Sequence, residues 1–154
     1  MKPRDVVDVE LDAVRHMFDV QKEILPMVVF VHDTEHHAMP LSFSTDYEKD
    51  VASDAIRRIV RETKPDAVVY MSEAWTIMLP KGEGLPKNLP RPSQHKDRVE
   101  IVAVMIEFKT GEKFSCMAKI LREQDKVTLE KFDVSEDKTM MGRFADFYVP
   151  ERTN

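Results

Sequence analysis

The sequence predicts a single α+β domain over residues 1–154, with two principal helices and a mainly antiparallel sheet of about six or seven strands. Two observations carry this prediction. Amphipathic stretches with helical spacing occur twice in the first half of the chain, whereas the second half holds β-rich runs separated by turn signals. Runs joined by short turns pair as hairpins, so we expect antiparallel neighbours in the order α-β-β-α-β-β-β-β(-β).

The first predicted helix spans Asp8–Leu25 and ends before Pro26, because a proline disfavours the helical conformation of the residue that precedes it. Two short strands follow, 27–31 and 38–44, with polar residues between them, so we expect a hairpin. Pro40 has no N–H to donate, and its position should therefore face outward at a sheet edge. The buried stripe of the helix is expected to be Leu11, Val14, Phe18, Gln21 and Leu25.

The second predicted helix begins after Thr45, which has capping-box spacing to Glu48, and ends at Lys64 and Pro65. We expect both helices to cover the same face of the sheet. The order of the first six elements is similar to that of roadblock- or profilin-like domains, a likeness of fold alone. The buried stripe of this helix is expected to be Tyr47, Val51, Ala55, Ile59 and Thr63.

In FKTGEKF, a three-residue loop with Gly111 in the left-handed conformation pairs Glu107 with Lys113 across two strands. That register makes one continuous apolar face and predicts that Cys116 is a buried thiol of the core rather than a nucleophile. A two-residue turn, which would place Lys113 opposite Phe108, is the alternative. The strands of this half of the chain are expected over 67–79, 98–108, 113–122 and 127–134, with a last candidate over 143–149.

The composition indicates a globular protein of a reducing compartment, for which cytoplasmic is the expected location. Hydrophobic residues are 42% and charged residues 33% of 154, and the net charge of −5 is spread along the chain. No Lys/Arg block gives a strong nucleic-acid signal, and no apolar run approaches the ~20 residues of a membrane span. Cys116 is the only cysteine, so an internal disulfide is excluded. Glycine motifs of nucleotide-binding loops and of the serine-hydrolase elbow are absent.

The stretch VHDTEHHAMP concentrates residues of the types that bind zinc or another divalent metal. With Thr34 and Glu35 at the turn of a hairpin, His32 and His37 would face each other, and a third ligand such as His16 or His95 would come from elsewhere. The competing interpretation is a solvated polar turn that makes only local hydrogen bonds. The metal hypothesis assigns as ligands His32, Asp33, His36 and His37.

Glu73 interrupts an apolar row, because alternate residues of its strand share one face with it. Three interpretations stay open. Arg98 on the next strand is the natural salt-bridge partner; the face is a subunit interface that includes Trp75; or a buried Glu73 has a raised pKa and acts as a general acid or base. The row consists of Val69, Met71, Glu73, Trp75, Ile77 and Leu79.

The connection from Pro80 to Asp97 is long, holds four prolines, and is locally basic in an acidic chain. It is interpreted either as a mobile arm or as a segment that meets an anionic ligand, a nucleic acid or an acidic partner. The basic residues in and beside it are Lys81, Lys87, Arg91, Lys96 and Arg98.

Two functions follow from these patterns. The favoured hypothesis is a non-enzymatic binding or assembly module, without a cofactor, that forms a homo-oligomer or binds a protein partner or a small anionic ligand. Its binding residues are predicted to be Glu73, Trp75, Lys81, Arg91 and Arg98. The alternative is a metal-dependent hydrolase centred on the histidine cluster, with Glu35 or Glu73 as the base.

Overall fold

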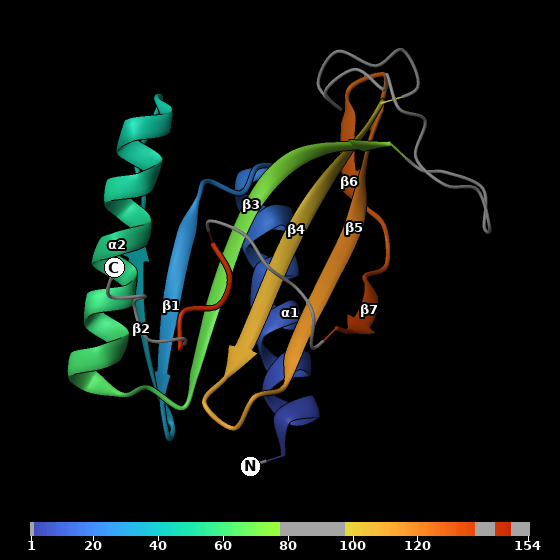
Figure 1. Cartoon of the computed structure of the whole chain (residues 1–154). Coiled ribbons are helices and arrows are strands. Elements are labelled where there is room, and N and C mark those ends of the chain that lie inside the picture. Colours follow the sequence, from blue (N-terminus) through green and yellow to red (C-terminus); the bar gives the residue numbers. More distant parts are fainter. Residues whose placement is uncertain (1, 78–97, 138–143, 149–154) are drawn as a thin grey trace.

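The computed structural model of the chain describes residues 2–77, 98–137 and 144–148 and forms an α+β fold of two helices and a seven-stranded antiparallel sheet (Figure 1). The element order confirms the predicted one. The elements are α1 (Pro3–Gln21), β1 (Met27–His32), β2 (Glu35–Pro40), α2 (Asp46–Thr63), β3 (Ala67–Ile77), β4 (Arg98–Phe108), β5 (Lys113–Glu123), β6 (Lys126–Leu129) and β7 (Asp133–Glu136).

The strands lie in the order β2-β1-β3-β4-β5-β6, and β7 pairs with the other half of β5, beside β6. The strand predicted over 127–134 is therefore two strands. Arg15 of α1 accounts for the interruption, because its guanidinium donates hydrogen bonds to the carbonyls of Leu129 (2.9 Å) and Glu130 (2.5 Å). Its charge also lies 5.6 Å from the centre of the Phe132 ring, so α1 holds the connection between β6 and β7.

The two helices cover opposite faces of the sheet, so the expectation of one shared face was wrong (Figure 1). The physical reason lies in β1 and β3, which are apolar on both sides. Val29 and Val69 pack with α1 in one core, whereas the adjacent Val28 and Val68 pack with α2 in another. A sheet whose central strands are apolar on both faces needs a cover on each face.

Within both helices the sequence pattern was only partly right. Helix α1 begins earlier, with Pro3 in the first turn where a proline is tolerated, and its end leaves Leu25 60% exposed instead of buried. In α2 the predicted cap is confirmed, since the Thr45 hydroxyl accepts from the Glu48 N–H at 3.1 Å. The predicted α2 stripe was mostly wrong, since Ile59 is its one member that packs against the core. The buried residues of α2 are Ser53, Ile56 and Val60, whereas Tyr47 and Val51 are exposed.

The hairpin between β4 and β5 confirms the predicted three-residue loop. Gly111 has φ +107°, a backbone conformation that residues with a side chain rarely adopt. The Phe108 N–H donates to the Glu112 carbonyl at 2.9 Å and closes the loop. Glu107 lies opposite Lys113 as expected. Cys116 is consequently fully buried, and burial raises the pKa of its thiol to about 11, which confirms it as a residue of the core.

Residues 144–148, which we call the C-terminal clasp, form turns over the α2 face of the sheet instead of the predicted strand. The buried carboxylate of Glu107 takes the place of a strand partner, because it accepts the backbone N–H groups of Phe147 (3.1 Å) and Tyr148 (3.3 Å). Further contacts are Arg57 to the Ala145 carbonyl (2.9 Å), the Tyr148 hydroxyl to the Pro65 carbonyl (2.8 Å), and Phe144 stacked on Tyr70 (4.3 Å).

Replacing Glu107 should release the clasp. In Glu107→Ala, the buried N–H of Phe147 and the half-buried N–H of Tyr148 lose their acceptor, and we expect the free energy of unfolding to fall by about 2–4 kcal/mol. Urea denaturation followed by circular dichroism measures this loss. Glu130→Ala, at an exposed position, is the control and should change stability by less than about 0.5 kcal/mol. Equal stability of the two variants would contradict the role of Glu107.

Candidate functional site

Strand β2 forms one edge of the sheet, and among the described residues no strand covers its outer side. The Leu41 N–H donates to the Pro26 carbonyl at 2.9 Å. The backbone N–H and C=O groups of Leu41, and of every second residue before it, therefore point towards β1, and those of the residues in between point outward. Pro40 therefore lies at an outward position, as its missing N–H predicted. His36 and Ala38 are the residues of β2 whose N–H and C=O groups both point away from the sheet.

Beside this edge, α2 presents an apolar stripe to the outside. Tyr47 is 77% exposed and Val51 is 51% exposed, and with Ala55 they line a hollow of about 330 Å³ against Met39 and Leu41 of the neighbouring segment. We call these five residues the edge groove. They include three of the residues that the sequence assigned to the core, because an apolar stripe with helical spacing looks the same whether a sheet or a partner covers it.

A second apolar hollow of about 680 Å³ lies on the other side of the segment that follows β2. Pro40 and Leu41 line both hollows, and Leu25 and Phe43 contribute to the second one only. The outer side of β2 is thus flanked by apolar surface on both sides. We call β2, the edge groove and this second hollow together the edge surface.

The histidine cluster is divided between the two faces of the sheet. The turn of the hairpin lies at Asp33 and Thr34, one residue earlier than predicted, which places His37 opposite Phe30 and not opposite His32. The observed pairing differs from the predicted one by two residues, so His32 and His37 still share the α2 face of the sheet. The centres of their rings lie 5.8 Å apart. His36 lies on the α1 face.

His36 meets a buried carboxylate of α1. Its Nδ1 lies 2.5 Å from Oε1 of Glu10, whose side chain is only 5% exposed. No hydrogen bond of conventional geometry reaches that oxygen in the described part of the chain. Burial raises the pKa of Glu10, and the close contact with His36 offsets this only in part. The contact ties the edge strand to α1.

The four predicted metal ligands do not converge. In the described ranges, no group of three or more His, Cys, Asp or Glu side chains is placed to hold a metal ion. The Asp33 backbone N–H donates to Asp66 at 2.7 Å. His16 is an exposed residue of α1, and His95 lies outside the described residues. His32 and His37 remain together as two ligands at most.

Glu73 lies on the α1 face of β3, and its predicted partner does not reach it. Arg98 is opposite Ile77 and lies over the Trp75 ring, 4.7 Å from its centre. Oε1 of Glu73 is buried, and within the described ranges no hydrogen bond reaches it. Burial, and then the nearby carboxylate of Glu100, raise the pKa of Glu73.

Glu100 itself is engaged, since Arg122 donates two hydrogen bonds to it at 2.7 and 2.8 Å. This ion pair lowers the pKa of the Glu100 carboxyl, and the charge of Arg122 offsets in part the rise that burial and Glu100 cause in the pKa of Glu73. Of the predicted binding residues, the structure brings Trp75 and Arg98 together, with Glu73 on the same strand as Trp75. Lys81 and Arg91 lie outside the described residues, as does the rest of the proline-rich connection.

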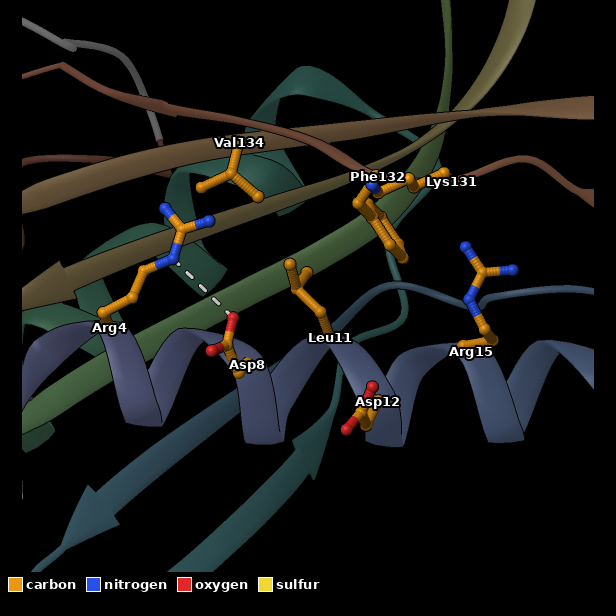
Figure 2. Close-up of a pocket in the computed structure, with 8 residues that line it drawn as sticks. All are labelled: Arg4, Asp8, Leu11, Asp12, Arg15, Lys131, Phe132 and Val134. Atoms are coloured by element: carbon orange, nitrogen blue, oxygen red, sulfur yellow. Dashed lines mark ion pairs between the residues drawn. The ribbon is translucent and has the colours of Figure 1, made fainter.

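A cleft of about 430 Å³ separates α1 from the connection between β6 and β7 (Figure 2). Figure 2 shows Arg4 and Arg15 near its two ends, with Leu11, Phe132 and Val134 between them. Both arginines are engaged within the fold: Arg4 pairs with Asp8 at 3.7 Å, and Arg15 holds two backbone carbonyls. The cleft therefore lies where α1 packs against the sheet edge, and the edge surface, with its exposed Tyr47 and Val51, is the candidate functional site.

A family model described as bacteriophage lambda protein ea47 matches residues 2–150, nearly the whole chain. No curated protein and no solved structure matches. In the described part of the chain, neither helix is long and apolar enough to cross a membrane.

The burial of the Glu10 carboxyl makes the stability of the fold depend on pH. Because burial raises the folded-state pKa of Glu10 above 4.5, the protonated form favours folding, and that contribution is lost as the pH rises through the folded-state pKa. We expect Glu10→Gln, which mimics the neutral carboxyl, to be more stable than the natural protein at neutral pH. This advantage should shrink as the pH falls towards 4.5.

Urea denaturation at several pH values measures the difference. Asp19→Asn, an exposed carboxylate of the same helix, is the matched control and should give a flat difference across the same range. A Glu10→Gln protein that is less stable at neutral pH than the natural one would show that the ionised pair stabilises the fold instead.

Proposed function

We propose that the chain, which belongs to the bacteriophage lambda protein ea47 family, is a non-enzymatic assembly module that associates with a second copy through its edge surface. The observation that carries this proposal is the exposed apolar stripe of α2 next to a sheet edge that no described strand covers. Tyr47 and Val51 expose 77% and 51% of their surface, although burying such side chains stabilises a protein by about 1.5–3 kcal/mol each. A monomer gains nothing from leaving them in water.

Strand pairing supports a second copy as the occupant. His36 and Ala38 offer outward N–H and C=O groups two residues apart, and antiparallel pairing of two β2 strands satisfies these groups reciprocally. The same patch serves in both copies, so the contact closes at a dimer. Helix α2 lies alongside β2 (Figure 1), so pairing at this edge also brings the Tyr47–Val51 stripes of the two copies towards each other.

Two features limit open-ended association at this edge. Pro40 has no N–H and ends the row of outward donors, and β2 has only six residues. A short strand that stops at a proline suits pairing with one matching strand and not with an indefinite series. The non-enzymatic part of the proposal is supported by the burial of Cys116 and by the division of the histidines between the two faces.

A charge placed in the edge groove should dissociate the dimer. We expect Val51→Glu and Tyr47→Glu to weaken association by about tenfold or more, because each buries a carboxylate at the contact. Analytical ultracentrifugation over a range of concentrations measures the dissociation constant. Val9→Glu is the control, since Val9 is also a helical valine that is 51% exposed, but on α1. A natural protein that stays monomeric, or equal weakening by Val9→Glu, would refute the proposal.

A metal-dependent hydrolase is the second candidate function, and the observation in its favour is the shared face of His32 and His37. A third ligand would have to come from residues outside the described ranges or from another molecule. Glu73 cannot serve this site as a base because it lies on the opposite face, which leaves Glu35, 3.3 Å from the His37 ring nitrogen.

Elemental analysis separates the two functions. After metal-free purification and reconstitution with zinc, the assembly proposal predicts well under one equivalent of bound metal. The double variant His32→Ala/His37→Ala should then bind no less zinc than the natural protein. One equivalent of zinc that disappears in the double variant would establish the metal site.

A further inference from the structure

Three cationic side chains meet at the C-terminal end of α2, on a different surface from the edge groove. They surround a cleft of about 300 Å³ with an apolar floor. Its described lining contains no carboxylate, although the chain as a whole has a net charge of −5. We call this site the basic cleft; the cations are Arg61, Lys64 and Lys109, and the floor is Val60, Phe147 and Tyr148.

Arg61 and Lys64 belong to the C-terminal end of α2, whereas Lys109 comes from a different part of the chain. Arg61, which already takes part in an interaction within the fold, lies in the last turn of α2, and Lys64 is the C-cap of this helix. Positive charge at both positions offsets the negative end of the helix dipole. Lys109 comes from the turn between β4 and β5. Its backbone N–H donates to the Asp66 carbonyl at 3.0 Å, which fixes that turn beside the end of α2.

The charge of Lys109 is only loosely compensated. Its Nζ lies 3.4 Å from an Asp66 carboxylate oxygen, and both side chains are more than half exposed. An exposed pair of this kind contributes little, about 0–1 kcal/mol, so a stronger anion can replace it. Asp66 is not among the residues that line the basic cleft, and its carboxylate is already bound by the Asp33 N–H.

The floor of the cleft is fixed before any ligand arrives. Tyr148 is half-buried, with its hydroxyl bonded to the Pro65 carbonyl and its backbone N–H bonded to Glu107. Phe147 and Val60 are 3% exposed each and close the bottom of the cleft. Pre-formed hollows with an apolar lining and a few convergent polar groups are typical small-molecule sites.

We propose that the basic cleft binds a small phosphate monoester that carries an apolar or aromatic group. A phosphate monoester has nearly two negative charges at neutral pH and three acceptor oxygens, which matches one guanidinium and two ammonium groups better than a single carboxylate does. The apolar group of the ligand then packs against Tyr148. This site is independent of the proposed dimer contact, which uses the opposite half of α2.

Titration of the full chain with phenyl phosphate, followed by amide NMR shifts and calorimetry, tests this proposal. We expect saturable binding at concentrations below about 10 mM, with shifts at the end of α2, and inorganic phosphate to bind about tenfold more weakly because it lacks the ring. Tighter binding of adenosine monophosphate than of phenyl phosphate would assign a nucleoside phosphate. The reverse order would assign a smaller aryl phosphate, and either order supports the site.

Variants locate the binding. Arg61→Gln, Lys64→Gln and Lys109→Gln should each weaken phenyl phosphate binding by about 3- to 10-fold. Arg58→Gln removes the same charge from the same helix outside the cleft and should change it by less than about twofold. No saturable binding of phenyl phosphate, equal weakening by Arg58→Gln, or inorganic phosphate binding as tightly as the aryl ester would each overturn the proposal.

Discussion

The two-sided apolar character of β1 and β3 is the constraint on which the rest of the structure depends. Successive residues of a strand point to opposite faces, so the pairs Val28–Val29 and Val68–Val69 place apolar side chains on both faces of the sheet centre. Neither face can remain in water. Helix α1 covers one face, and the opposite face has to be covered by elements that are separate in sequence.

That opposite face is shared between α2 and the C-terminal clasp, and the division explains where the candidate surfaces lie. Phe147 packs with Ile56 and Val60 in one core, while Phe144 stacks on Tyr70 of β3. With the clasp over the central strands, α2 lies towards the β2 edge and buries only a narrow side. Its other apolar side is left facing outward, where it forms the edge groove.

The sequence was most informative where structure is decided locally. The loop at Gly111 and the cap at Thr45 follow from the chemistry of a few adjacent residues, and both were predicted with their partners. The α2 stripe could not be decided in this way, because the helix has two apolar stripes one residue apart, represented by Ala55 and Ile56. One residue is about 100° of rotation, and only the position of the sheet chooses between them.

Features that depend on contacts between residues far apart in the sequence could not be predicted either. The last segment has the aromatic composition of a strand, but its N–H groups are taken by the side chain of Glu107, which no local pattern reveals. Arg98 was the nearest cation to Glu73 in the expected sheet, yet the register places it four residues away along the strand, over Trp75. The helical spacing of Tyr47 and Val51 did indicate an apolar stripe, but we predicted that this stripe packs in the core, whereas it lines the edge groove.

Helix α2 carries both proposed sites, one in each half, and its middle decides whether they influence each other. Coupling between two sites needs an element with two alternative arrangements that both ligands bias. The middle of α2 has one packed arrangement, because Ile56 is fully buried and Arg57 binds both the Ser53 hydroxyl and the Ala145 carbonyl. A helix fixed at its centre transmits little from one end to the other, so association at the edge and anion binding at the basic cleft should be independent properties of the same helix.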